Sequence, residues 1–112
     1  MINITIIKNN SQILTIEATG HSGYAESGSD IVCSAVSTLT QALINGLIEV
    51  VKITPKYVID ENIPHLSVTL PKDISEDKLK YAQVLMNSTY LALKQVANSY
   101  QKFIKIKEKQ ND

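Results

Sequence analysis

Two stretches at the start of the chain alternate apolar and polar residues, which is the period of a β-strand with one buried face. Isoleucine recurs at every second position from residue 2 to residue 6, and residues 12–18 also alternate. Asn9-Asn10-Ser11 lies between them and supplies residues that favour a turn. Because a short turn joins adjacent antiparallel strands, these stretches predict a β-hairpin.

A long apolar pattern at helical spacing follows the hairpin and predicts a helix from about residue 31 to residue 53. Asp30 is a good N-cap for it, and Pro55 ends it. Gly46 lies inside this helix at a cost of roughly 1 kcal/mol relative to alanine, for which a close backbone contact is a physical reason. The apolar stripe consists of Ile31, Val32, Ala35, Val36, Leu39, Leu43, Leu47 and Val50.

The second half of the chain repeats this order of elements. Residues 57–60 and 65–70 are rich in β-formers and flank a polar turn, so they predict a second hairpin. Ser75 is placed to cap a second helix. Residues 103–107 alternate and suggest a last strand, whereas residues 107–112 are charged and are expected to fray. The order β-β-α-β-β-α predicts a two-layer α+β fold, a mainly antiparallel sheet with both helices on one face.

Composition limits the classes of function. The chain has 112 residues, the expected size of one domain over 1–112, and its eleven basic residues balance eleven acidic ones. That balance argues against a nucleic-acid-binding protein that neutralises many phosphates. A single cysteine forms no intramolecular disulfide, and a reactive thiol persists best in the reducing cytoplasm. We see no targeting segment and no apolar run of membrane-spanning length, so we expect no membrane partner.

Residues 20–37 concentrate the reactive side chains and the flexible backbone. They hold the only cysteine, Cys33, one of the two histidines, His21, and three of the four glycines. With Asp30 as N-cap, Cys33 is the third helical residue, where unpaired N–H groups and the helix dipole favour a thiolate. The dipole contributes only about 0.3–1 kcal/mol, too little to ionise a thiol at neutral pH, so a base is needed. His21 follows the strand over 12–18, and a Gly/Ser loop can bring it to Cys33, as in nucleophilic catalysis.

These residues resemble the signature of the ribosomal-processing cysteine protease family, called Prp, a group of small bacterial proteins. The signature combines a Gly-His pair, a glycine-containing loop and a helix start that carries the cysteine. The matching residues are Gly20, His21, Gly28, Asp30, Ile31, Val32, Cys33 and Ser37. The resemblance implies a homodimer that removes the N-terminal extension of the large-subunit ribosomal protein L-twenty-seven, cutting after an aromatic residue in a short apolar segment.

We assign roles to these residues as expectations. Cys33 attacks the scissile carbonyl, His21 carries the proton to the leaving amine, and first-turn N–H groups near Cys33 hold the oxyanion. Asp30 caps the helix and is a candidate to orient the loop or His21. Ser37 shares the face of Cys33, either in the site or bonded to a helix carbonyl. The expected substrate loop comprises Gly20, Ser22, Gly23, Gly28 and Ser29. The chemistry requires neither a metal nor a cofactor, and we expect His65 to be exposed and outside the site.

Three other functions compete with this interpretation. A binding module could hold an anion at the helix start, but Glu26 and Asp30 repel anions and residues 20–37 contain no Lys or Arg. A single-cysteine redox protein remains open for peroxide sensing, although the lack of a C-x-x-C pair excludes thioredoxin-like exchange. A serine hydrolase would use Ser22, Ser27 or Ser29 with His21, but no G-x-S-x-G motif is present.

Overall fold

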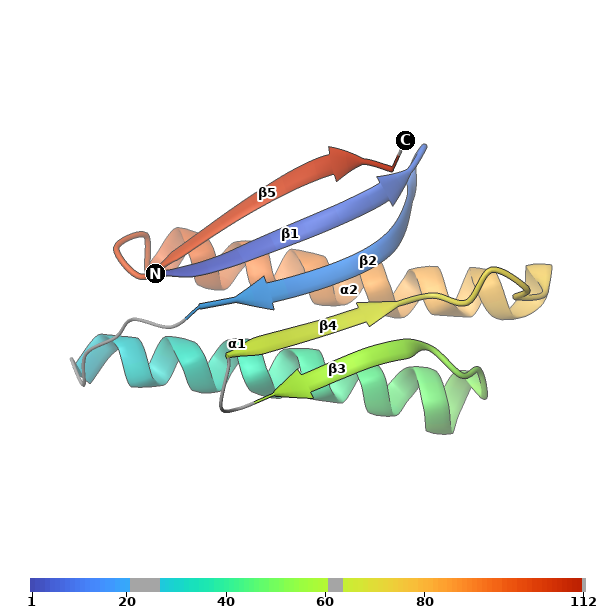
Figure 1. The fold of residues 1–112 in the computed structure, drawn as a ribbon, viewed down its shortest axis with the longest axis horizontal. Helices are drawn as coiled ribbons and strands as arrows, with labels where there is room; N and C mark the ends of the chain where they lie inside the picture. The colour runs from blue at the N-terminus through green and yellow to red at the C-terminus, as the bar shows by residue number, and fades with distance from the viewer. Residues whose placement is uncertain (21–26, 61–63, 112) are drawn as a thin grey trace.

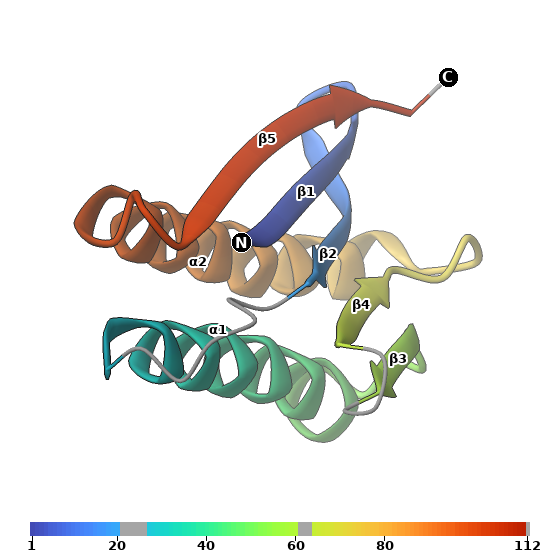
Figure 2. The same cartoon turned by 60° about the vertical axis from the view of Figure 1, so that its left-hand side comes forward.

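The computed structural model of the protein describes residues 1–20, 27–60 and 64–111. Five strands form one sheet, and two helical segments lie together on one of its faces (Figures 1 and 2). This is the α+β, two-layer arrangement that the sequence predicts, and the suspected C-terminal strand is present. The elements are β1 (Ile2–Asn9), β2 (Gln12–Thr19), α1 (Ser27–Asn45), η1 (Gly46–Val51), β3 (Lys56–Asp60), β4 (His65–Thr69), α2 (Glu76–Ser99) and β5 (Ile104–Gln110).

The strand order in the sheet is β3-β4-β2-β1-β5. Both predicted hairpins pair antiparallel, β1 with β2 and β3 with β4, and β4 also pairs antiparallel with β2. The sheet is mixed, because β5 runs parallel to β1. The alternation of apolar and polar residues in β1 reflects one buried face, as predicted. Ile2, Ile4 and Ile6 are at most 3% exposed and face the helices. The two hairpins thus meet along β2, which lies at the centre of the sheet.

The first helix begins at Ser27, four residues earlier than predicted. Asp30 therefore lies inside α1 and is not its N-cap. Ser, Gly and Asp all favour the cap position, so the run from Ser27 to Asp30 does not by itself fix where the helix begins. Cys33 becomes the seventh residue of α1, where its N–H bonds within the helix. The expected dipole activation and first-turn oxyanion hole at Cys33 are wrong for this reason, because both effects belong to the first turn.

The C-terminal end of this helix agrees with the sequence prediction. The chain stays helical through Val51, although the last six residues form the π-helix η1. A Cβ built on Gly46 would lie 3.1 Å from Cδ1 of Leu85 in α2, so the neighbour of this glycine is a side chain and not the close backbone contact that we expected. Lys52 closes the helix in the left-handed region with φ of 67°, and its carbonyl accepts a hydrogen bond from Lys78 Nζ at 2.9 Å.

The second helix and the last strand complete the sheet. Ser75 caps α2 as predicted, because its hydroxyl accepts a hydrogen bond from the N–H of Lys78 at 3.4 Å. The expectation that residues 107–112 fray is wrong for 107–110, which pair with residues 5–8 of β1. The N–H of Asn111 also donates to the carbonyl of Lys8 at 2.7 Å. Main-chain pairing orders this polar segment without an apolar face of its own.

Residues Ile31–Val51 form a helix long and apolar enough to cross a membrane, with a mean hydropathy of 1.6. Our expectation that no apolar run reaches that length is wrong. Several of its apolar side chains pack in the core against the sheet and α2, namely Val32, Val36, Leu43, Ile44, Leu47 and Val51. A core helix meets the same criteria of length and hydropathy, so this helix alone is weak support for a membrane span.

Candidate active site

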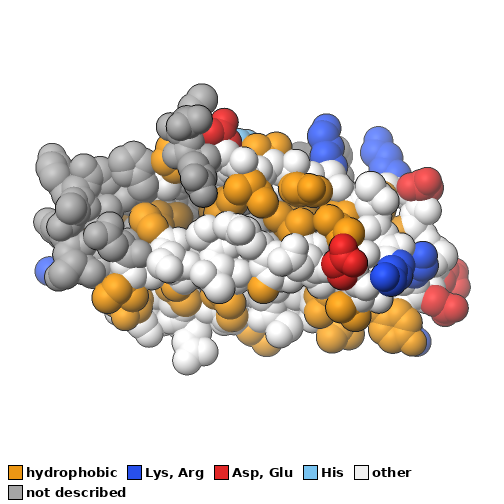
Figure 3. Space-filling model, turned by 90° about the horizontal axis from the view of Figure 1, so that it is seen from below, with side chains coloured by type: hydrophobic (Ala, Val, Ile, Leu, Met, Phe, Trp, Pro, Cys, Tyr) orange, Lys and Arg blue, Asp and Glu red, His pale blue; other side chains and the backbone are white. Residues whose placement is uncertain are grey.

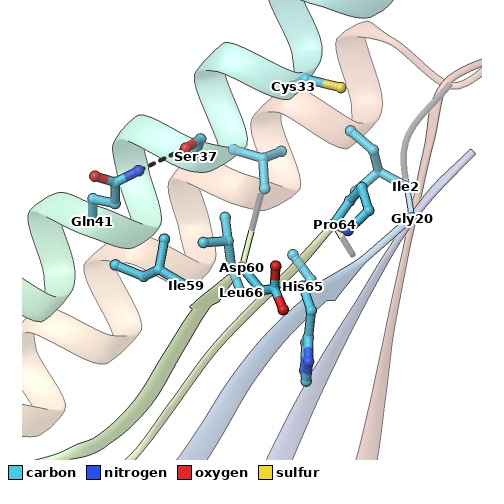
Figure 4. A pocket seen from close by; sticks show the side chains of 12 residues that line it. Ile2, Gly20, Cys33, Ser37, Gln41, Ile59, Asp60, Pro64, His65 and Leu66 are labelled. Carbon is cyan, nitrogen blue, oxygen red and sulfur yellow. Dashed lines mark hydrogen bonds between the residues drawn. The ribbon is translucent and has the colours of Figure 1, made fainter. Parts of the chain in front are cut away.

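A cavity of about 250 Å³ lies between the first half of α1 and the sheet (Figure 4). Cys33 reaches it from α1, and its sulfur points toward the side formed by Ile2 and Gly20. The side chain of Cys33 is partly buried and packs against the core. The remaining lining residues are Ala18, Val36, Ser37, Gln41, Ile59, Asp60, Pro64, His65 and Leu66. The cavity is smaller than the roughly 300–1,000 Å³ of common ligand sites, so it can hold only part of a peptide.

Helical spacing places three polar or reactive side chains along the cavity. Cys33, Ser37 and Gln41 are four residues apart and share one face of α1, while Val32 and Val36 beside them are buried. Gln41 Nε2 donates a hydrogen bond to Ser37 Oγ at 2.8 Å (Figure 4). Ser37 therefore lines the cavity, which is one of the two alternatives that the sequence left open for it. Gln41 was not predicted, although its position two turns beyond Cys33 was a signal that could have identified it.

Gly20 fixes the end of β2 where the chain leaves the sheet. Its φ is +84°, a conformation that L side chains rarely adopt, and a Cβ would lie 2.6 Å from the carbonyl oxygen of Met1. Its N–H donates to the carbonyl of Pro64 at 3.0 Å. Only glycine fits this position, because any other residue would meet both backbone strain and backbone atoms. The residue before His21 is therefore bonded to the start of the second half of the β3–β4 hairpin and closely packed against Met1.

The second hairpin contributes a wall of the cavity that the sequence did not predict. Ile59 and Asp60 end β3, Pro64 comes just before β4, and Leu66 is the second residue of β4. They reach the site because β4 pairs with β2, so that the ends of both hairpins meet. No local pattern in residues 57–70 indicates this, since the pairing of β4 with β2 joins segments about fifty residues apart.

The imidazole of His65 points away from Cys33 (Figure 4). His65 pairs in register with Thr19, and its Nε2 lies 3.1 Å from Oε2 of Glu17, a residue of β2. Its side chain is 34% exposed, so it is partly covered rather than exposed as expected. His65 thus lines the cavity, contrary to the expectation that it lies outside the site, while its ring is paired with Glu17.

The other predicted site residues lie in or next to the segment before α1. His21, Ser22 and Gly23 are outside the described residues, as is Glu26. The backbone of Gly28, Ser29 and Asp30 is helical and forms part of the first turn of α1. Among residues 1–20, 27–60 and 64–111, no three His, Cys, Asp or Glu side chains gather as a metal ion would require.

Comparison with known proteins identifies relatives that span the chain. A family model described as "Cysteine protease Prp" matches residues 1–105. The ribosomal processing cysteine protease Prp of Bacillus subtilis is 26% identical over 107 residues, which cover 95% of this chain and 96% of that protein. Several solved structures are also similar, including the following two. SMU.848 from Streptococcus mutans has a TM-score of 0.87 at 30% identity, covering 99% of this chain and 96% of that one. Prp from S. aureus in complex with a substrate peptide has a TM-score of 0.84 at 20% identity, and the match covers 97% of this chain and 100% of that chain.

Proposed function

Because this chain belongs to the Prp family of cysteine proteases, we propose that Cys33 is the nucleophile and that His21 is its base. One observation carries the assignment of the nucleophile. The only cysteine of the chain lies on the cavity wall, partly buried but open to the space between α1 and the sheet. A protease of this class needs a thiolate at a site that a peptide can reach.

The proposed reaction has two stages. The Cys33 thiolate attacks the carbonyl carbon of the scissile bond, and the thiol proton held by His21 passes to the leaving amine as the C–N bond breaks. This leaves a thioester between Cys33 and the acyl part of the peptide. Water then attacks the thioester carbonyl, gives a proton to His21, and releases the carboxyl product and the thiolate. No metal or cofactor enters either stage.

Two observations support His21 as the base. The chain has two histidines, and the ring of the other one, His65, points toward Glu17 and away from Cys33. Gly20, the residue before His21, is held next to the cavity by its hydrogen bond to Pro64. Because Cys33 lies beyond the first turn of α1, helix dipole activation is weak there, so the thiolate depends on an imidazole partner.

We propose the N-terminal extension of ribosomal protein L-twenty-seven as the substrate. The B. subtilis relative is named as a ribosomal processing protease, and the family resemblance implies an apolar cleavage segment. The cavity wall suits such a segment, since Ile2, Ala18, Val36, Ile59 and Leu66 all line it. Apolar linings with few polar groups are typical of sites that bind apolar side chains. By the same resemblance we propose a homodimer that acts in the cytoplasm on a protein substrate, without direct contact to nucleic acid or membrane.

A peptide assay tests this function. A synthetic peptide that spans the L-twenty-seven extension is incubated with the wild-type protein and with Cys33→Ala, and the products are identified by mass spectrometry. We expect cleavage by the wild type alone. Intact peptide in both reactions would favour a binding module. Cleavage that persists in Cys33→Ala but is lost in Ser22→Ala, Ser27→Ala or Ser29→Ala would instead indicate a serine hydrolase.

A further inference from the structure

The two edges of the sheet differ in how they are protected from pairing with another strand. The β5 edge carries Lys105, Lys107 and Lys109 at alternate positions, all exposed. Lysines on an edge strand discourage pairing with a further strand, because a partner would have to bury or approach these charges. The β3 edge has charged residues only at its two ends, Lys56 and Asp60, and three consecutive apolar residues between them, Tyr57, Val58 and Ile59. By this criterion the middle of the β3 edge is more open to a partner strand than the β5 edge.

The helix layer covers β4 but not β3. Tyr57 pairs in register with Val68 of β4, and both therefore lie on the helix-facing side of the sheet. Val68 is 0% exposed, whereas Tyr57 is 48% exposed. Ile59, on the same side of β3, is 42% exposed, and Val58 on the opposite side is 39% exposed. Figure 3 shows hydrophobic side chains gathered on the face of the molecule that includes α1 and β3. Both faces of β3 thus offer apolar surface to a neighbouring strand.

This edge leads directly to the candidate active site. The last two residues of β3, Ile59 and Asp60, line the cavity that contains Cys33 (Figure 4). The cavity of about 250 Å³ is too small for more than part of a peptide, so the remainder of a bound substrate must lie on the surface beside it. An extended chain that pairs with β3 would satisfy the outward N–H and C=O groups of this strand and would cover Tyr57 and Ile59.

We propose that the substrate peptide docks as a sixth, extended strand along β3, from which its scissile segment continues past Asp60 into the cavity. This inference rests on the proposed function and adds a binding mode to it. The occupant is an extended peptide with apolar side chains, recognised through its main chain and through contacts with Tyr57 and Ile59. A second copy of the chain, paired through the same strand, is the alternative occupant that the experiment must separate.

Binding is measured first, with the Cys33→Ala protein and a fluorescent peptide that carries the full flanks of the L-twenty-seven cleavage segment. Peptides methylated at one backbone nitrogen at a time should lose affinity with a period of two residues along the docked flank, because alternate N–H groups of an added strand bond to the edge. Amide hydrogen exchange of β3 should slow when the unmodified peptide binds. Uniform effects of methylation, unchanged exchange in β3, or no binding of the peptide would each overturn the proposal.

Side-chain variants test the path between β3 and the cavity. Tyr57→Lys copies the charge pattern of β5 at a residue that does not line the cavity. Leu91→Lys, at a residue of α2 that is 63% exposed, is the matched control. Each is measured in the wild-type background with the long peptide and with a peptide truncated to the cleavage segment. We expect Tyr57→Lys to lower the ratio of kcat/KM for the long peptide to that for the short peptide by about tenfold. An equal loss in Leu91→Lys, or an unchanged ratio in Tyr57→Lys, would contradict docking on β3.

Failure of this inference is distinguishable from failure of the proposed function. If the peptide binds along β3 but the wild type does not cleave it, the protease assignment is wrong and the docking proposal stands. If the wild type cleaves the peptide and cleavage does not depend on β3, the docking proposal is wrong and the protease assignment stands. Light scattering gives the molar mass of the wild type and of Tyr57→Lys, and so tests whether a second copy of the chain occupies β3. If the substitution converts a dimer into monomers, β3 belongs to the interface between copies and the docking proposal is wrong.

Discussion

The backbone N–H of Gly20 donates a hydrogen bond to the carbonyl oxygen of Pro64 at 3.0 Å. This bond ties the end of the central strand β2 to the residue just before β4, and both residues line the cavity. We predict that Gly20→Ala destabilises the protein by about 2 kcal/mol or more, since a left-handed alanine costs roughly 1–2 kcal/mol before any clash. Its Cβ would also lie 2.6 Å from the carbonyl oxygen of Met1. Urea denaturation measures the loss.

Gly46→Ala is the matched control for that substitution. Its Cβ would contact the end of a flexible leucine side chain at 3.1 Å, which can shift by a few tenths of an ångström. Alanine inside a helix gains up to about 1 kcal/mol over glycine, which offsets the tight contact. We therefore expect a change in the free energy of unfolding of less than about 1 kcal/mol. A larger loss in Gly46→Ala than in Gly20→Ala would show that the conformation of Gly20 is not the limiting feature.

Alkylation kinetics compare the two histidines as partners of Cys33. A free thiol is only a few per cent ionised at pH 7, so loss of an ionising base slows its reaction with iodoacetamide. We predict that His21→Ala slows alkylation of Cys33 at neutral pH by about tenfold and slows peptide cleavage by at least about 10²-fold. His65→Ala should leave the alkylation rate near that of the wild type, because its ring points toward Glu17. The reverse order of effects would remove His21 from the proposed mechanism.

The hydrogen bond between Gln41 and Ser37 predicts coupled effects on substrate binding. Gln41 Nε2 lies 2.8 Å from Ser37 Oγ, and both residues line the cavity. Ser37→Ala leaves the Gln41 amide without this partner, so both single variants should raise KM for the peptide by a similar factor. The double variant should be little worse than either single one, with a coupling energy of about 0.5–1.5 kcal/mol. Fully additive changes in KM would show that the two side chains act independently.

Glu108 of β5 forms an ion pair with Lys8 of β1 and a hydrogen bond with Tyr90 of α2. Hydrogen bonds from Lys8 and Tyr90 hold the pKa of Glu108 below its ordinary value of 4.5, while burial raises the pKa of Tyr90 and keeps it a donor. A lowered folded-state pKa stabilises the fold above pH 4.5, and this stabilisation is lost as the pH falls through the folded pKa.

We therefore expect Glu108→Gln to lower the free energy of unfolding at pH 7 by less than about 1 kcal/mol, because the pair is partly exposed. The difference from the wild type should shrink when urea denaturation is repeated at successively lower pH below 4.5. Glu49→Gln, on η1, removes the same charge away from β5 and serves as the control. A loss in Glu108→Gln that stays constant across this range would exclude the carboxylate as its cause.

Local patterns predicted most of the secondary structure because each element depends mainly on its own residues. The alternation of Ile2, Ile4 and Ile6 predicted a strand with one buried face, and Ser75 predicted the start of α2. The start of α1 was missed because Ser27, Ser29 and Asp30 are all strong candidates for the N-cap. The extent of β5 was missed because residues 107–110 have no apolar signal and depend on pairing with β1.

The candidate site was predictable only where its residues are close in the sequence. Cys33 was singled out as the only cysteine, near a histidine and a predicted helix start, and Ser37 was placed beside it by helical spacing. Gln41 continues the same face. Ile59, Asp60 and Leu66 were not identified, because they reach the cavity through the pairing of β4 with β2. That pairing depends on which hairpin edges meet in the folded sheet, and no single segment encodes it.

The parallel pairing of β5 with β1 also has a consequence for the biosynthesis of the protein. Ile2 lies in the cavity wall, and its N–H bonds to the carbonyl of Phe103 at 2.8 Å, at the opposite end of the chain. A nascent polypeptide therefore carries β1 without its outer partner until the C-terminal residues have left the ribosome. The part of the candidate site wall that Ile2 forms would therefore be fixed in place late in synthesis, which would restrain proteolysis by unfinished chains.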